Sequence, residues 1–168
     1  MLFDITHEGR ATSRVSRAEA VELGYPGDVI ATALKAAALH QVTQFAETYR
    51  ARIASQSAGK LAEYRFKEEI ARDPASASEA ELALLSREAK ARGTNRTGLI
   101  GMISARAAAY RQIALLIGVI EAETGAAIAA VADDADDIET QIITTLGAAK
   151  AQAETAFSEA LALINGGS

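Results

Sequence analysis

The sequence predicts an all-α protein, an elongated helical bundle or coiled-coil-like helical hairpin with a short amino-terminal β arm. After Thr97, two long apolar-striped segments run without proline and are joined only by the acidic stretch Asp133–Asp137. Only a helical repeat brings Ile103, Tyr110 and Ile117 to the same side of such a segment. Much of the 49% hydrophobic content is alanine, which favours closely approaching helices over a thick globular core.

The arm is predicted over residues 1–15. Leu2, Phe3 and Ile5 lie among polar residues before a turn signal at His7–Arg10, which indicates a short strand or hairpin. Two strands alone are marginal in water, so the arm needs either a neighbouring chain or the helices to hold it. We therefore expect Leu2, Phe3 and Ile5 to be docking residues.

Residues 16–73 are predicted to contain a short capped helix followed by a long helix pair. Ser16 and Glu19 have the spacing of a capping box, in which each side chain accepts a hydrogen bond from the other residue's backbone N–H. Gly24 and Pro26 then provide a stop signal. A helix of about two turns is expected between these signals.

The long helix pair is indicated by apolar residues at three-and-four spacing. The stripe begins at Ile30, weakens over Ser55–Gly59, and resumes until Pro74. A residue before proline is pushed out of helical geometry, which ends the second helix of the pair. Gly59 therefore marks either a kink or a short turn.

Residues 74–168 are predicted to form three helices, of which the last two make a long hairpin. Ser78 opens a second capping box, and Gly93 ends the helix that begins there. Either Thr94 or Thr97 then caps the first long helix.

The two long helices carry a heptad pattern. One column contains positions 103, 110, 117, 124 and 131, and a second contains positions 113, 120 and 127. A seven-residue repeat implies partner helices, and isoleucine in both columns favours three or four helices around an axis over two. We assign the oligomer or packing interface to Ile103, Tyr110, Ile113, Ile117, Ile120, Val131, Ile138, Ile142 and Leu146.

Two features of the hairpin have local explanations. Asp133 and Asp134 lie where carboxylates can accept the free N–H groups of the last helix. Gly125 and Gly147 each interrupt a helical pattern, at a cost of about 1 kcal/mol relative to alanine. We expect both glycines to mark close helix contact or a local bend.

No catalytic, cofactor-binding or metal site is predicted. The chain has no cysteine, which excludes disulfides, zinc–thiolate sites and thiol nucleophiles. His7 and His40 are the only histidines, the residue type best suited to acid–base catalysis near neutral pH, and a helix-flank position explains His40. Gly93–Gly98 has the glycine spacing of a phosphate loop without its lysine, and Asp133–Asp137 lacks the central glycine and final glutamate of a calcium loop.

Charge is distributed unevenly along the chain, whose net charge is −5. Up to Arg111 there are 16 lysines and arginines against 13 acidic residues, whereas after it Lys150 alone faces nine acidic residues. The acidic end opposes nucleic-acid binding, which needs a cationic surface. One cationic stretch could bind a polyanion, although a solvated helix face explains it more simply. It contains Arg87, Lys90, Arg92, Arg96, Arg106 and Arg111.

We expect a soluble chain without a membrane span. Asp4 and Glu8 lie where a secretory signal needs a basic start and an apolar stretch. The longest uninterrupted apolar run, Ile113–Ile120, is well below the roughly 20 residues that cross a bilayer.

Three phrases carry a family resemblance. They are residues 62–74 (AEYRFKEEIARDP), 82–89 (LALLSREA) and 107–112 (AAAYRQ), within a region from Gly59 to Glu123. These phrases resemble small alanine-rich helical proteins encoded near the tail genes of tailed bacteriophages and prophages of alphaproteobacteria. The resemblance carries no catalytic residues. It implies a virion or tail-associated structural subunit that is cytoplasmic in the producing cell before assembly and contacts other virion proteins.

The sequence therefore favours a non-enzymatic interaction subunit of a phage particle, tail- or fibre-associated, that forms a homo-oligomer, with a trimer favoured. The chief alternative is a host-type amphipathic helical module bound to a granule or lipid surface. That alternative requires a basic polar face, which the acidic final third does not supply. An enzyme would need a ligand pocket between the helices.

Overall fold

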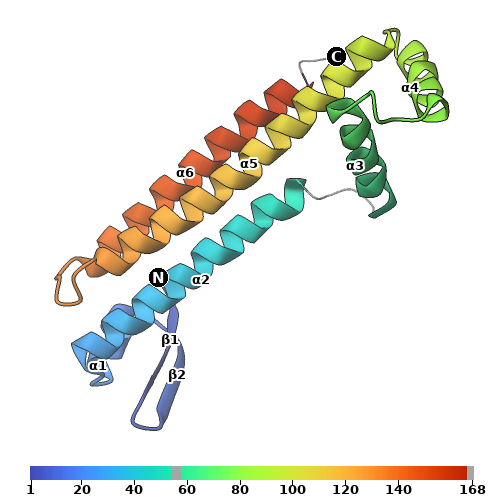
Figure 1. Cartoon of the computed structure of the whole chain (residues 1–168). Helices are drawn as coiled ribbons and strands as arrows, with labels where there is room; N and C mark the ends of the chain where they lie inside the picture. The colour runs from blue at the N-terminus through green and yellow to red at the C-terminus, as the bar shows by residue number, and fades with distance from the viewer. Residues whose placement is uncertain (54–57, 166–168) are drawn as a thin grey trace. The chain divides into compact units, whose positions relative to one another are not determined.

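The computed structural model describes residues 1–53 and 58–165, and Figure 1 shows their arrangement. Two strands open the chain, and six helices follow within this described part. The elements are β1 (Phe3–His7), β2 (Arg10–Val15), α1 (Arg17–Glu22), α2 (Gly27–Ile53), α3 (Ala58–Arg72), α4 (Glu79–Ala91), α5 (Arg96–Ala130) and α6 (Ile138–Asn165). The predominantly helical class with a short amino-terminal β arm is confirmed.

Two local predictions touch residues that are not described. The stretch Ser55–Gly59, predicted to weaken the long helix, lies mostly outside the described residues, and Gly59 itself falls in the first turn of α3. The predicted frayed tail at residues 166–168 also lies outside them.

β1 and β2 form an antiparallel hairpin with a tight turn and a bulge. Glu8 and Gly9 have φ values of 49° and 80° at the turn, as a type I′ turn requires. The register pairs Phe3 with Val15 but Ile5 with Thr12, so β2 carries one extra residue. Arg14 has a φ of 56° in this bulge, and its N–H donates to Asp4 Oδ1 at 2.9 Å.

The helix start and stop signals act as predicted in α1 and α4. Each helix begins with a complete capping box, on Ser16 and Ser78 respectively. α1 ends in a Schellman motif, in which Gly24 has a φ of 79° and the Tyr25 N–H donates to the Ala20 carbonyl at 3.1 Å.

The cap of α5 differs from the prediction. α4 ends in a second Schellman motif at Gly93, which has a φ of 72°, and the Thr94 N–H closes that motif. Asn95 then caps α5, because its Oδ1 accepts the Gly98 N–H at 2.8 Å. The prediction of Thr94 or Thr97 is wrong because Thr94 belongs to the end of α4 and Thr97 already lies inside α5.

The chain divides into two compact units. Unit 1 contains residues 1–50 and 116–155, and unit 2 contains residues 51–115 and 156–168. The predicted segments 1–15, 16–73 and 74–168 do not coincide with these units. Each unit instead combines stretches that are distant in sequence, because a long helix buries its apolar face against whichever helices lie beside it.

In unit 1, the end of α5 and the start of α6 form a hairpin across the 131–137 loop, so the chain folds back at Asp133 (Figure 1). α2 lies alongside this hairpin. The shared core consists of Phe3, Ile5, Val15, Ala20, Tyr25, Ile30, Ala31, Leu34, Ala38, Val42, Ile128, Ile138 and Ile142.

The arm is held by the helices of its own chain. Phe3 and Ile5 are each 3% exposed and belong to the unit 1 core, whereas Leu2 is 51% exposed. The structure therefore assigns Phe3 and Ile5 to the core instead of a docking surface. Leu2 is the predicted docking residue that stays accessible.

Unit 2 has a smaller core of its own. Ile70 of α3, Leu85 and Ala89 of α4, and Leu99 of α5 are buried together, and Leu82 packs against them. Helices α3, α4 and the start of α5 are thus fixed to one another by a short apolar contact.

The residues predicted to form an oligomer or packing interface are buried or partly buried within the single chain. Five are buried, namely Ile113, Ile117, Ile120, Ile138 and Ile142. The other four are partly buried, namely Ile103, Tyr110, Val131 and Leu146. Because the buried five already pack against the chain's own residues, a contact with a second copy must use other side chains.

The two helical glycines have different surroundings. A Cβ added at Gly125 would lie 3.6 Å from Leu39 Cδ2, so α5 passes close to α2 at this point. A Cβ added at Gly147 would meet no atom within 4 Å. The contact at Gly125 is an ordinary van der Waals contact that an alanine could also make, and no contact explains Gly147.

Candidate functional site

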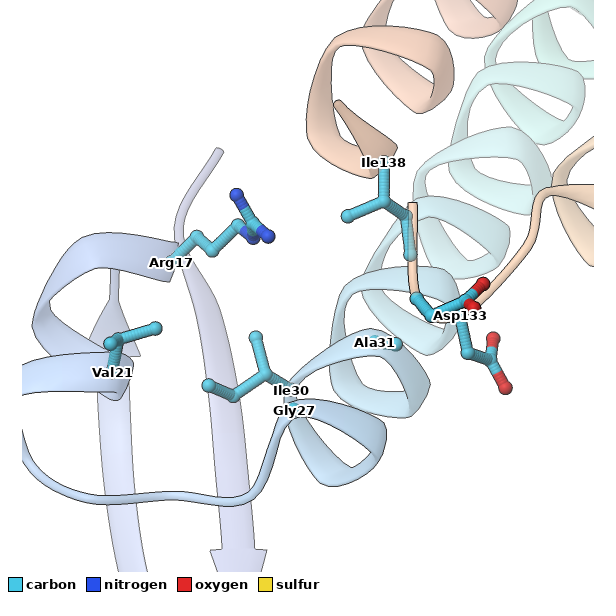
Figure 2. Close-up of a pocket in the computed structure, with 8 residues that line it drawn as sticks. Arg17, Val21, Gly27, Ile30, Ala31, Asp133 and Ile138 are labelled. Atoms are coloured by element: carbon cyan, nitrogen blue, oxygen red, sulfur yellow. The ribbon is translucent and has the colours of Figure 1, made fainter. Parts of the chain in front are cut away.

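The first candidate site is a pocket of about 180 Å³ in unit 1, here called the loop pocket. Figure 2 shows Arg17 and Val21 approaching it from α1, Ile30 from α2, and Ile138 from the start of α6. The residues that line the pocket are Arg17, Val21, Gly27, Ile30, Ala31, Asp133, Asp134 and Ile138.

Two cations fix the loop that borders this pocket. Lys35 Nζ donates to the carbonyls of Ala129 and Val131, at 3.2 and 2.5 Å, and to Asp133 Oδ1 at 2.6 Å. Arg17 Nη1 donates to the Asp136 carbonyl at 3.0 Å. Lys35 thereby satisfies carbonyls that the end of α5 leaves without helical partners.

The role predicted for Asp133 changes accordingly. Its carboxylate pairs with Lys35 and does not cap α6, which begins five residues later at Ile138. At the start of α6, Asp137 Oδ1 instead accepts the Gln141 side-chain amide at 2.7 Å. The acidic stretch therefore combines two carboxylates that accept hydrogen bonds, those of Asp133 and Asp137, with the exposed carboxylates of Asp134 and Asp136.

The loop pocket has little chemistry of its own. The Arg17 donor is used on a backbone carbonyl, and the apolar lining comes from core residues. No group of three or more histidine or carboxylate side chains is placed to hold a metal ion among residues 1–53 and 58–165.

The second candidate site is a pocket of about 290 Å³ in unit 2, here called the basic pocket. It lies among α3, α4 and the first part of α5, and it combines aromatic, apolar and charged side chains. The residues that line it are Tyr64, Lys67, Glu68, Glu88, Leu99, Arg92, Met102, Ile103, Arg106, Ala107 and Tyr110.

An ion-pair network forms one wall of the basic pocket. Lys67 Nζ lies 2.7 Å from Glu88 Oε2 and 2.5 Å from Glu63 Oε1, and Arg92 Nη2 lies 2.7 Å from Glu88 Oε1. Burial alone would lower the pKa of Lys67, but its hydrogen bonds to the two glutamates outweigh burial and raise that pKa. Burial alone would likewise raise the pKa of Glu88, but hydrogen bonds from Lys67 and Arg92 lower it.

One cation that lines the basic pocket has no carboxylate partner. Glu68 pairs with Arg111 and, at 3.0 Å, with Arg72. Arg106 is partly buried and forms no ion pair with another residue of the described part of the chain. The basic pocket thus holds three cations against two carboxylates that already have partners.

The predicted cationic stretch is therefore divided by the structure. Arg92 and Arg111 are used in ion pairs, Arg106 lines the pocket, and Arg87, Lys90 and Arg96 are exposed. Sequence reasoning missed the contributions of Tyr64 and Lys67, which come from α3. The signals that could have found the network wall are the i,i+4 pairs Glu63–Lys67 and Glu88–Arg92.

The two histidines are not brought together. His40 Nε2 is 2.9 Å from Gln44 Nε2 on an exposed part of α2, and His7 Nε2 is 3.8 Å from Glu8 Oε1 at the hairpin turn. Neither histidine lines the loop pocket or the basic pocket.

α5 has a strongly apolar composition. Within the described residues it is the one helix long and apolar enough to cross a membrane, judged by length and composition alone. Only 28% of its most apolar window is buried inside the fold. The run Ile113–Ile120 understates this segment, because alanine and glycine extend its apolar character beyond Glu121.

Comparisons with family models, curated proteins and solved structures give no match to this chain.

Proposed function

We propose that this protein is a non-enzymatic structural subunit of a phage particle, tail- or fibre-associated, that assembles with copies of itself. The observation that carries the proposal is the low burial of the apolar window of α5. An apolar surface left in water is unfavourable by about 25 cal/mol per Å², so a partner that covers it gains free energy.

The proposed assembly surface is the exposed side of α5. Leu115 is 72% exposed and Val119 is 48% exposed, one helical turn apart. This surface replaces the buried isoleucines as the region of contact between copies, because those isoleucines are occupied inside the chain. Copies would still assemble through helix–helix packing, as the heptad pattern predicts.

Assignment to a virion rests on the resemblance of residues 62–74, 82–89 and 107–112 to tail-associated phage proteins. Other virion proteins are the further partners that this resemblance implies. A mostly helical chain whose pocket charges are mostly paired suits a structural role, since a catalytic site needs groups that converge on a substrate.

Light scattering coupled to size exclusion tests the assembly. The proposal expects a discrete oligomer at micromolar protein concentration, with a trimer favoured. A monomer at all concentrations up to the highest attainable would contradict it. Immunogold labelling of particles from a producing strain would then test the virion assignment separately.

One observation favours a second candidate, binding to a lipid or granule surface. The apolar surface of α5 could enter a nonpolar phase as well as contact another helix. Flotation with neutral and anionic vesicles separates the two candidates. Comigration with vesicles would favour the lipid-surface function, and a soluble oligomer that stays at the bottom of the gradient would favour the structural subunit.

A further inference from the structure

The two units carry opposite net charge. Unit 1 contains six lysines and arginines against 14 acidic residues, and unit 2 contains 11 against eight. Unit 1 is therefore −8 and unit 2 is +3. Two copies of such a chain attract each other when unit 1 of one meets unit 2 of the other, and they repel when unit 1 meets unit 1.

The basic pocket offers a place where this attraction can become a specific contact. Arg106 brings a guanidinium with five N–H donors to a partly buried position without an ion-pair partner in the described chain. Tyr64 and Tyr110 border the same pocket. Its volume of about 290 Å³ suits one or two side chains and is too small for a helix.

The 131–137 loop offers the complementary group. Asp134 and Asp136 are exposed, while the loop backbone is fixed by Lys35 and Arg17. A loop that is already ordered loses little conformational entropy when it binds. Arginine and carboxylate groups also form the strongest and most directional of the common ion pairs.

We propose that the basic pocket of one copy binds the acidic 131–137 loop of a second copy, with Arg106 as the receiving cation and Asp134 or Asp136 as the inserted carboxylate. This inference rests on the proposed function, because it adds a second contact between copies beside the α5 surface. The contact uses different surfaces on the two partners. Such a head-to-tail interface produces a ring when the rotation closes and a filament when it does not.

Charge exchange provides the test, with sedimentation velocity over a concentration series as the readout. Arg106→Glu alone and the loop variant Asp134→Lys/Asp136→Lys alone are each expected to weaken self-association about tenfold or more. Combining the pocket and loop substitutions is expected to restore most of the wild-type association, because the ion pair is rebuilt with reversed signs. Arg87→Glu is the matched control, an exposed arginine of α4 with the same charge change.

The outcomes separate this inference from the proposed function. If the wild type self-associates but Arg106→Glu behaves like Arg87→Glu, the pocket–loop contact is wrong and assembly through α5 stands. If the combined variant self-associates no more strongly than the pocket variant or the loop variant alone, the proposed ion pair is also wrong. If the wild type never self-associates, the proposed function fails as well. Circular dichroism and thermal melting of each variant show whether it remains folded, and a loss of association in a folded variant supports the contact.

Discussion

At the scale of single residues, the local environment decides whether a position requires a given residue type. Glycine at three positions illustrates this. Gly24 has a positive φ that an L-residue adopts only with strain, Gly125 passes Leu39, and Gly147 is helical with open space around it. The same residue type is thus required at the first position, compatible with alanine at the second, and dispensable at the third.

Replacing Gly147 with alanine is expected to stabilise the protein. The substitution removes backbone freedom from the unfolded chain and creates no clash, so the free energy of unfolding should rise by about 0.5–1 kcal/mol. Urea denaturation followed by circular dichroism measures this change.

Gly24→Ala is the control, and it should lower the free energy of unfolding by about 1 kcal/mol or more because of its positive φ. A marked destabilisation by Gly147→Ala would contradict the open environment and point to a partner that approaches α6 at this position.

At the scale of elements, charged side chains determine how helices end and how they join. Lys35 from α2 closes the end of α5, and Lys67 from α3 connects to α4 through Glu88. The Lys35 contact joins helices far apart in sequence, and the Lys67 contact joins consecutive helices. Exposed ion pairs within one helix, by comparison, contribute little.

Substitution of Lys35 by methionine is expected to loosen the turn between α5 and α6. The terminal carbonyls of α5 and the carboxylate of Asp133 lose their donor, at a cost of about 1–2 kcal/mol. Hydrogen exchange should become faster for amides of the 131–137 loop. Lys150→Met, on an exposed part of α6, is the control and should leave that exchange unchanged.

The Lys67–Glu88–Arg92 network should make stability depend on pH in acid. Glu88 has a pKa below its ordinary value of 4.5, so its contribution is complete above pH 4.5 and is lost as pH falls through its lower folded-state pKa. Lys67 has a pKa above 10.5, so its contribution persists below that pH and is lost as pH rises beyond it.

Glu88→Gln should therefore lower the free energy of unfolding at pH 7 by on the order of 1 kcal/mol. On acidification, the variant should lose less additional stability than the wild type does. Urea unfolding at pH 7 and in acid measures both effects. Glu69→Gln, an exposed glutamate of α3, controls for the change of net charge. Equal acid sensitivity in Glu88→Gln and the wild type would show that the network does not contribute.

For the whole molecule, the exposed side of α5 is the main determinant of assembly. The double variant Leu115→Gln/Val119→Gln should remain folded, because both side chains are largely exposed. Its self-association should be weaker than that of the wild type by about tenfold or more. Light scattering over a concentration series measures the effect. Leu84→Gln tests specificity, since Leu84 is 62% exposed on α4. If both variants lose association equally, the loss reflects general surface polarity instead of an α5 contact.

Local signals made much of this fold predictable. The capping boxes at Ser16 and Ser78 and the stop at Gly24 depend on residues close in sequence, and each was found where the spacing indicated. The heptad columns identified the buried side of α5 correctly at Ile117 and Ile120. Periodicity could not show whether the covering helix came from the same chain, because both arrangements bury the same side.

The candidate sites were largely beyond sequence reasoning. The basic pocket combines Tyr64, Glu88 and Arg106 from three different helices, and no local spacing relates them. The partner of Asp133 was likewise hidden, since Lys35 lies 98 residues earlier in the chain. Contacts of this kind depend on how helices pack, which apolar patterns constrain only loosely.

The bulge at Arg14 also bears on how the protein avoids aggregation. An outer strand exposes unpaired backbone groups that can template the addition of strands from other molecules. On β2, the extra residue interrupts the regular ladder, and Arg10 and Arg14 place charge along the strand. The amino-terminal hairpin is therefore a poor seed for amyloid-like stacking, even where many copies are crowded together.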